Sequence, residues 1–144
     1  MVQRMALTVV LFAACVWCLA FVTRVDSAPP ALADGSFKPV ASINGLMTGQ
    51  ILAFKQLQQS LNGKKGADRP KAIQLTSEAL AELANVNTYN GEKDDYRGWA
   101  AQLRDTALEL AGEAKKKDNA DETKMKSLLA TLEATCKSCH DVYQ

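Results

Sequence analysis

The sequence predicts an all-α protein that folds as an antiparallel, up-down-up-down four-helix bundle. Apolar residues recur at spacings of three and four in four segments between residue 39 and the C-terminus, and no segment is typical of a β-strand. Short polar connections separate these segments, and short connections favour antiparallel neighbours. The composition, 47% hydrophobic and 23% charged, is that of an ordinary globular chain.

Residues 1–27 predict an export signal. Arg4 precedes an apolar run over residues 5–22, and Ser27 and Ala33 each end a stretch that suits cleavage. The run is long for a signal peptide, so an uncleaved membrane anchor is the alternative, which would tether the protein to the membrane. Either way, we expect a periplasmic location.

Residues 28–38 predict a linker, and residues 39–144 predict one helical domain. The chain has 17 basic and 16 acidic residues, and loss of Arg4, Arg24 and Asp26 with the signal would leave 15 of each. A nearly neutral domain gives no basic surface for nucleic acid, so we expect none as a partner.

The first two helices are predicted from Pro39 or Ser42 to about Leu61 and from Pro70 to about Val86. Asn62 and Gly63 end the first, and Pro70 suits the first turn of the second. Gly45 and Gly49 indicate either close approach to a bulky flat cofactor or fraying near the helix start. The predicted buried positions are Ile43, Met47, Ile51, Phe54, Leu57 and Leu61, then Ile73, Thr76, Leu80, Leu83 and Ala84.

The third helix is predicted to begin at Asp94 or Asp95 and to include Lys115 to Lys117 in its last turn, where cations suit the helix dipole. Residues 118–121 cap the fourth helix. The predicted buried positions are Tyr96, Trp99, Ala100, Leu103, Ala107, Leu110 and Ala111, then Met125, Leu128, Leu129, Leu132, Cys136, Cys139 and His140.

The fourth helix ends in a chemical motif, Cys136-Lys137-Ser138-Cys139-His140. C-x-x-C-H is the attachment pattern for c-type haem, in which two thiols add to the haem vinyl groups and the imidazole becomes an axial iron ligand. On a helix these three side chains share one face, which is also the apolar face. The sequence therefore predicts one covalent haem c on the core side of this helix, at one end of the bundle.

Other interpretations of the two thiols are weaker. An exported, haem-free helical module with a Cys136–Cys139 disulfide remains open. Structural zinc needs four ligands, and the mature chain offers three such residues because His140 is the only histidine. Cys15 and Cys18 also form C-x-x-C, but Leu19 follows them, so they predict no second haem site.

The segment Cys-Lys-Ser-Cys-His-Asp-Val-Tyr, residues 136–143, resembles the C-terminal end of the class II cytochromes c, the cytochrome c-prime type. In that family the motif lies on the fourth helix near the chain end, and an aromatic residue, here Tyr143, follows it. The sequence departs from the family at Gln144, where a basic residue is common. The resemblance implies either a six-coordinate His/Met electron carrier or a five-coordinate protein that binds gases such as NO or CO.

The sixth ligand distinguishes these two functions. In low-spin members of the family a methionine from the first helix binds the iron opposite the histidine, and Met47 matches that place. Met125 lies 15 residues before His140 on the same helix, roughly 22 Å away, so it cannot reach the same iron. If Met47 only packs nearby, Leu46 or Ile43 would contribute to an apolar pocket instead. Tyr143, Trp99 and Tyr96 are candidates for packing against the haem.

The sequence thus predicts a periplasmic electron carrier, more like the low-spin branch of that family than its gas-binding branch, and not an enzyme. Cys136 and Cys139 would attach the haem, and His140 and Met47 would bind its iron. Its partners would be redox proteins. Members of the family often form homodimers, although nothing in this sequence argues for one.

Overall fold

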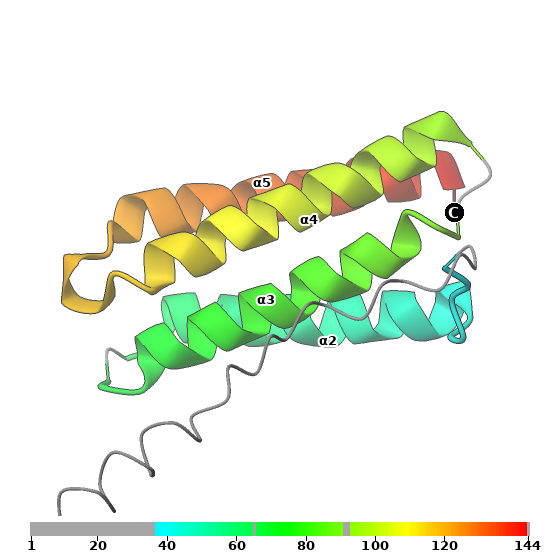
Figure 1. Cartoon of the computed structure of the whole chain (residues 1–144). Helices are drawn as coiled ribbons and strands as arrows, with labels where there is room; N and C mark the ends of the chain where they lie inside the picture. Colours follow the sequence, from blue (N-terminus) through cyan, green and yellow to red (C-terminus); the bar gives the residue numbers. More distant parts are fainter. Residues whose placement is uncertain (1–36, 65, 91–92, 144) are drawn as a thin grey trace, which may run out of the picture. The chain divides into compact units, whose positions relative to one another are not determined.

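The computed structural model describes residues 37–64, 66–90 and 93–143, and every described residue outside the loops is helical. The predicted export signal and most of the predicted linker lie outside these ranges. The helices are α2 (Ile43–Asn62), α3 (Arg69–Asn87), α4 (Asp94–Ala114) and α5 (Glu122–Tyr143), with a short 3-10 turn η1 (Lys117–Asn119) before α5 (Figure 1). The prediction of an all-α domain is confirmed.

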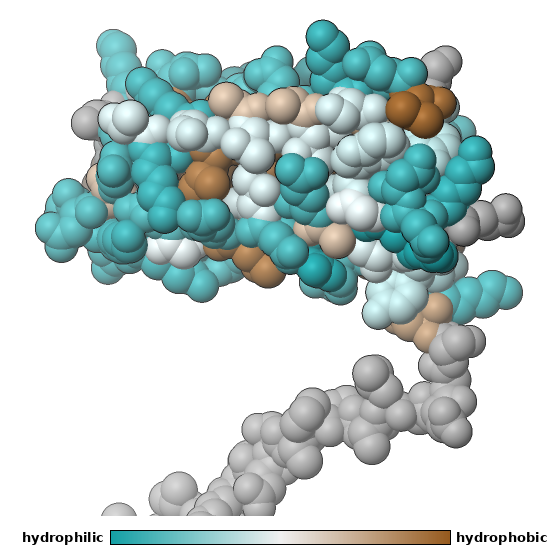
Figure 2. All heavy atoms as spheres, turned by 90° about the horizontal axis from the view of Figure 1, so that it is seen from above, coloured by the Kyte–Doolittle hydropathy of each residue, from teal (hydrophilic) through white to brown (hydrophobic). Residues whose placement is uncertain are grey.

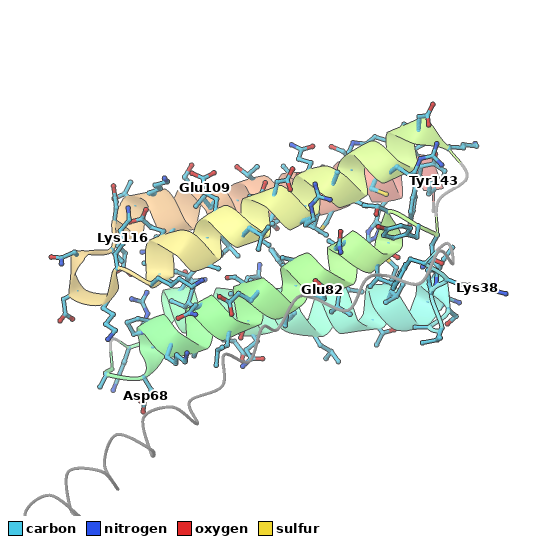
Figure 3. All side chains as sticks on the ribbon, viewed as in Figure 1. Lys38, Asp68, Glu82, Glu109, Lys116 and Tyr143 are labelled. Carbon is cyan, nitrogen blue, oxygen red and sulfur yellow. The ribbon has the colours of Figure 1, made fainter. Side chains whose placement is uncertain are left out.

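The helices pack against one another in chain order: α2 on α3, α3 on α4, and α4 on α5. Contact between α2 and α5 is much slighter. In Figure 3, Lys38 and Tyr143 lie at one end of the domain, whereas Asp68 and Lys116 lie at the other. Each end therefore gathers residues that are far apart in the sequence.

Polar side chains and a proline define the helix starts. The Ser42 hydroxyl accepts a hydrogen bond from the Gly45 N–H at 3.2 Å, which is the usual cap of a helix N-terminus. Pro70 occupies the first turn of α3, where its missing N–H costs nothing. Asp121, one of the residues predicted to cap the last helix, accepts a hydrogen bond from the Lys124 N–H at 3.0 Å.

Apolar side chains from all four helices form one core. Leu57, Leu110 and Leu132 are completely buried, and each stabilises the fold by about 2 kcal/mol relative to an exposed side chain. The predicted buried positions on α3, α4 and α5 are mostly confirmed, because the apolar spacing there matches the faces that pack. The buried hydrophobic core comprises Ala53, Leu57, Leu61, Ile73, Leu80, Ala81, Ala84, Leu103, Ala107, Leu110, Ala114, Met125, Leu129 and Leu132.

The predicted apolar face of α2 is wrong in its first half. Ile43 and Ile51 are 43% and 45% exposed. The buried positions are Leu46, Gln50, Ala53, Leu57 and Leu61. Gly49 explains the rotation, since a Cβ there would lie 3.2 Å from Leu83 Cδ1 of α3. The close approach suggested by this glycine is therefore made to a neighbouring helix.

The prediction that the third helix includes Lys115 to Lys117 is also wrong. α4 ends at Ala114, and Lys117 has φ 53°, a left-handed conformation that interrupts a right-handed helix. Figure 2 shows one face of the domain as mostly hydrophilic, with scattered hydrophobic residues. Among the described residues, no helix has the length and apolar character needed to span a bilayer.

Candidate functional site

A cavity at one end of the domain is lined by residues of all four helices. The space inside it that water-sized molecules can occupy is about 30 Å³, and all empty space counted with the open solvent at its mouth is about 360 Å³. The start of α2, the end of α3, the start of α4 and the end of α5 all contribute to it. Its lining includes Met47, Gln50, Trp99, Cys136, Cys139 and His140.

The structure brings together most of the residues that the sequence singled out. Cys136, Cys139 and His140 line the cavity from α5, Met47 from α2 and Trp99 from α4. All five are partly buried, so each contacts both the cavity and the protein around it. Met47 and His140 are 93 residues apart in the sequence. They line the same cavity only because the four helices pack together.

Tyr143 contacts the aromatic residues of this wall. Its ring packs edge-on against Tyr96, with centroids 5.5 Å apart, and against Trp99 at 6.0 Å. Its hydroxyl donates a hydrogen bond to Asp95 Oδ1 at 2.5 Å. The Lys93 ammonium lies 5.4 Å from the ring centroid, within the range of a cation–π contact. Tyr143 therefore fastens the end of α5 to the start of α4, beside Cys139 and His140.

Both cysteines are free thiols in the structure. Burial raises the pKa of the Cys136 thiol, and the neighbouring Cys139 raises it further. Burial also raises the pKa of Cys139, with an added effect from the Asp95 carboxylate. The two sulfurs are therefore protonated at neutral pH. Addition of an S–H group across a vinyl double bond forms a thioether without an oxidant, so these thiols suit haem attachment.

Three polar residues of the cavity contribute buried atoms without a hydrogen-bond partner. They are Gln50 through Nε2, Asn87 through Oδ1 and Tyr96 through its hydroxyl. Burial raises the pKa of Tyr96, and the negative charge that Cys139 carries when ionised adds to the shift. Gln50 and Asn87 are site residues that the sequence did not predict. Gln50 could have been found from its position, because it lies three residues after Met47 on a helix face whose other buried residues are apolar.

The chemistry of the lining residues suits a covalently attached haem. Trp99, Ala100 and Leu103 provide apolar walls, His140 provides an imidazole, and the unpartnered polar atoms could bind polar groups of a ligand. No cluster of three or more His, Cys, Asp or Glu residues in the part of the chain that the structure describes could hold a metal ion by itself. A haem iron has a different requirement, because the porphyrin supplies four of its ligands and the protein supplies only axial ones.

Comparison with known proteins provides no relative: no family model, curated protein or solved structure matches this chain.

Proposed function

We propose that this chain is a c-type cytochrome of the class II kind, which carries electrons in the periplasm and is not an enzyme. Cys136 and Cys139 attach one haem c by thioether bonds. His140 is the proximal iron ligand and Met47 the distal one. When bound, the haem supplies a one-electron iron couple, and a histidine–methionine ligand pair favours a relatively high reduction potential.

The observation that carries this proposal is the shared cavity. Cys136, Cys139 and His140 line it from α5, and Met47 lines it from α2. Thioether formation needs two thiols beside the porphyrin edge, and six-coordinate iron needs axial groups from different sides. The slight contact between α2 and α5 supports a position for the haem between these two helices.

The positions of Ile43 and Leu46, the neighbours of Met47 on α2, favour ligation of the iron by Met47 over a vacant distal side. Ile43, which would contribute to an apolar distal pocket, is 43% exposed. Leu46 is buried, but Met47 rather than Leu46 lines the cavity. A thioether on this wall suits axial ligation, because methionine sulfur binds haem iron in electron-carrying cytochromes. The chain then binds the iron on both faces and leaves no site for a gas.

In this proposal the four helices form an antiparallel up-down-up-down bundle, and the haem lies at one end of it. Residues 1–27 would export the chain and then be cleaved, or would remain as a membrane tether. The support for this is the coincidence, in one sequence, of an export signal and the C-x-x-C-H motif. Redox proteins would be the partners, and a homodimer is compatible with the resemblance.

Covalent attachment is tested by producing the full-length chain with a cytochrome maturation system, followed by denaturing gel electrophoresis and haem staining. We expect a stained band from the native chain and none from the Cys136→Ala/Cys139→Ala double variant. A native chain that folds without covalent haem would overturn the proposal. If that chain also contained a Cys136–Cys139 disulfide, it would be the haem-free helical module.

The distal ligand is tested by optical spectroscopy and carbon monoxide. We expect the native oxidised protein to show the weak absorption near the red end that sulfur ligation causes, and the native reduced protein not to bind carbon monoxide. Met47→Leu should lose that absorption and bind the gas rapidly. Met125→Leu, which changes a buried methionine lining a different cavity, is the matched control. Rapid binding by the native protein would favour the five-coordinate, gas-binding function.

A further inference from the structure

Tyr143 joins the last turn of α5 to the start of α4. Its hydroxyl donates a hydrogen bond to Asp95 Oδ1 at 2.5 Å, and its ring packs edge-on against Tyr96 and Trp99. All three of these partners belong to α4, so every one of these contacts passes from one helix to the other. Tyr143 therefore restrains the end of α5 through both a polar and an apolar contact.

The acceptor of this hydrogen bond is itself fixed in place. Asp95 lies in the first turn of α4, where a carboxylate suits the positive end of the helix dipole. The backbone N–H of Tyr96 donates a hydrogen bond to Asp95 Oδ1 at 2.8 Å, and this is the same oxygen that Tyr143 binds. Hydrogen bonds to an ionised acceptor are stronger than those between neutral groups. Tyr143 is thus attached to a well-defined point on the neighbouring helix.

The turn that Tyr143 restrains is the one that contains the proposed proximal ligand. α5 ends at Tyr143, and His140 lies three residues earlier, on the same face of the helix (Figure 3). The carbonyls of a last helical turn lack partners within the helix, and helix ends fray unless other contacts hold them. The contacts of Tyr143 oppose fraying of the turn from which His140 lines the cavity.

Asp95 also lies close enough to the haem attachment motif to act on it electrostatically. Burial raises the pKa of the Cys139 thiol, and the Asp95 carboxylate adds to the shift. Cys139 precedes His140 directly and would be held by a thioether bond. The contact between Tyr143 and Asp95 therefore restrains the turn on the side that follows His140, whereas the thioether bond would restrain the side that precedes it.

We propose that Tyr143, through its hydrogen bond to Asp95, positions the His140 imidazole for axial ligation of the haem iron. This inference rests on the proposed function. Tyr143 acts through the helical turn and is a positioning residue, in the way that outer residues orient the ligands of a metal. A restrained imidazole keeps one ligand geometry in both oxidation states, which suits an electron carrier.

The test uses the haem-loaded, full-length protein with Met47→Leu, so that the reduced iron is five-coordinate and His140 is its only protein ligand. Resonance Raman spectra then contain the iron–histidine stretching band. We expect one narrow band in this background. Tyr143→Phe and Asp95→Ala should each broaden the band and move it to lower frequency, because a less restrained imidazole binds the iron less uniformly. The two substitutions together should change it no further than either one alone.

Two controls separate the hydrogen bond from other effects. Asp95→Asn removes the charge but keeps an acceptor oxygen for the Tyr143 hydroxyl, so it should retain most of the unsubstituted band. Tyr89→Phe is the matched tyrosine control, because Tyr89 is 56% exposed, packs against Phe37 and does not belong to the lining of the cavity. We expect Tyr89→Phe to leave the band unchanged.

The outcomes distinguish this inference from the proposed function. A band that is unchanged in Tyr143→Phe and Asp95→Ala, with covalent haem retained, would overturn the inference alone, even if both variants had a lower Tm. Equal changes in Asp95→Ala and Asp95→Asn would also overturn it, because the charge rather than the hydrogen bond would then be responsible. Absence of covalent haem from the native chain would overturn the proposed function as well.

Discussion

At the scale of single residues, the hydrogen bond between Tyr143 and Asp95 is the feature with the most direct pH consequence. The Asp95 carboxylate raises the pKa of Tyr143 to about 12 from 10.0. Conversely, the Tyr143 hydroxyl lowers the pKa of Asp95 below its usual 3.8. Both shifts favour the same state, a protonated phenol that donates to an ionised carboxylate. The pair therefore stabilises the fold over the pH range in which both groups keep these forms.

Tyr143→Phe is expected to lower the free energy of unfolding at neutral pH, because it removes this hydrogen bond. A raised phenol pKa contributes stability fully below pH 10 and loses it as the pH rises towards about 12. A lowered carboxyl pKa contributes above pH 3.8 and loses it as the pH falls further. Urea denaturation followed by circular dichroism at several pH values measures the difference between native and variant proteins.

We expect that difference to be constant near neutrality and to shrink at both extremes. Asp95→Ala, which removes the acceptor, is the matched partner in a double-mutant cycle, and Tyr143→Phe should cost little more in its background. Equal and independent effects of the two substitutions would contradict a direct interaction between these side chains.

At the scale of elements, α2 shows how a glycine determines which face of a helix is buried. Gly49 lies against Leu83 of α3, and Ala53 is buried one turn later. Small residues let the two helices approach each other, so the buried face passes through Leu46 and Gln50 instead of Ile43 and Ile51. That rotation leaves Met47 half-buried at the cavity and places Gln50 deeper within it.

Alanine at the two glycines tests this packing. Gly112, in α4, has nothing within 4 Å of an added Cβ, so Gly112→Ala should stabilise the protein by about 0.5–1 kcal/mol through helix propensity alone. At Gly49 the added Cβ would lie 3.2 Å from Leu83, which must move to accommodate it. Gly49→Ala should therefore gain clearly less, or lose stability, in urea denaturation. Equal gains at both positions would argue against a tight α2–α3 contact.

At the scale of the whole molecule, the two ends of the domain are built differently. The cavity end leaves three polar atoms unsatisfied, whereas at the other end Arg69, at the start of α3, makes several hydrogen bonds to neighbouring helices. Arg69 Nε donates to the Ser60 carbonyl at 2.7 Å, and its Nη2 donates to the Leu61 carbonyl at 2.9 Å and to Glu122 at 2.5 Å. One guanidinium thus joins the end of α2 to the start of α5.

Arg69→Met is expected to destabilise the domain by about 2–3 kcal/mol, because it leaves two carbonyls and a partly buried carboxylate without this donor. The Arg69 side chain is only 10% exposed. Arg104→Met is the control, since Arg104 is 33% exposed and pairs with Asp105 on the surface, where ion pairs contribute little. Urea denaturation measures both, and similar small losses would contradict the role given to Arg69.

The substitution should leave the optical spectrum of the loaded protein unchanged. Arg69 lines a cavity separate from the one that contains His140 and Met47. A changed spectrum would show that the two ends of the domain are coupled.

The sequence by itself determined the all-α class and most buried positions on α3, α4 and α5, because apolar spacing reports a helical face directly. It also determined that Cys136, Cys139 and His140 lie on one face of the last helix, because residues three and four positions apart share a helix face. Met47 as a partner across the domain was inferred from the family resemblance and helix order. Its role in binding iron is still a prediction.

Only the tertiary structure decided the rotation of α2, the end of α4 at Ala114 and the gathering of Gln50, Asn87 and Tyr96. These features depend on contacts between segments that are distant in sequence, such as Gly49 with Leu83. Periodicity describes one helix at a time, whereas the buried face of a helix is selected by the neighbour that approaches it most closely. For the same physical reason, a site shared by four helices becomes visible only after they have packed.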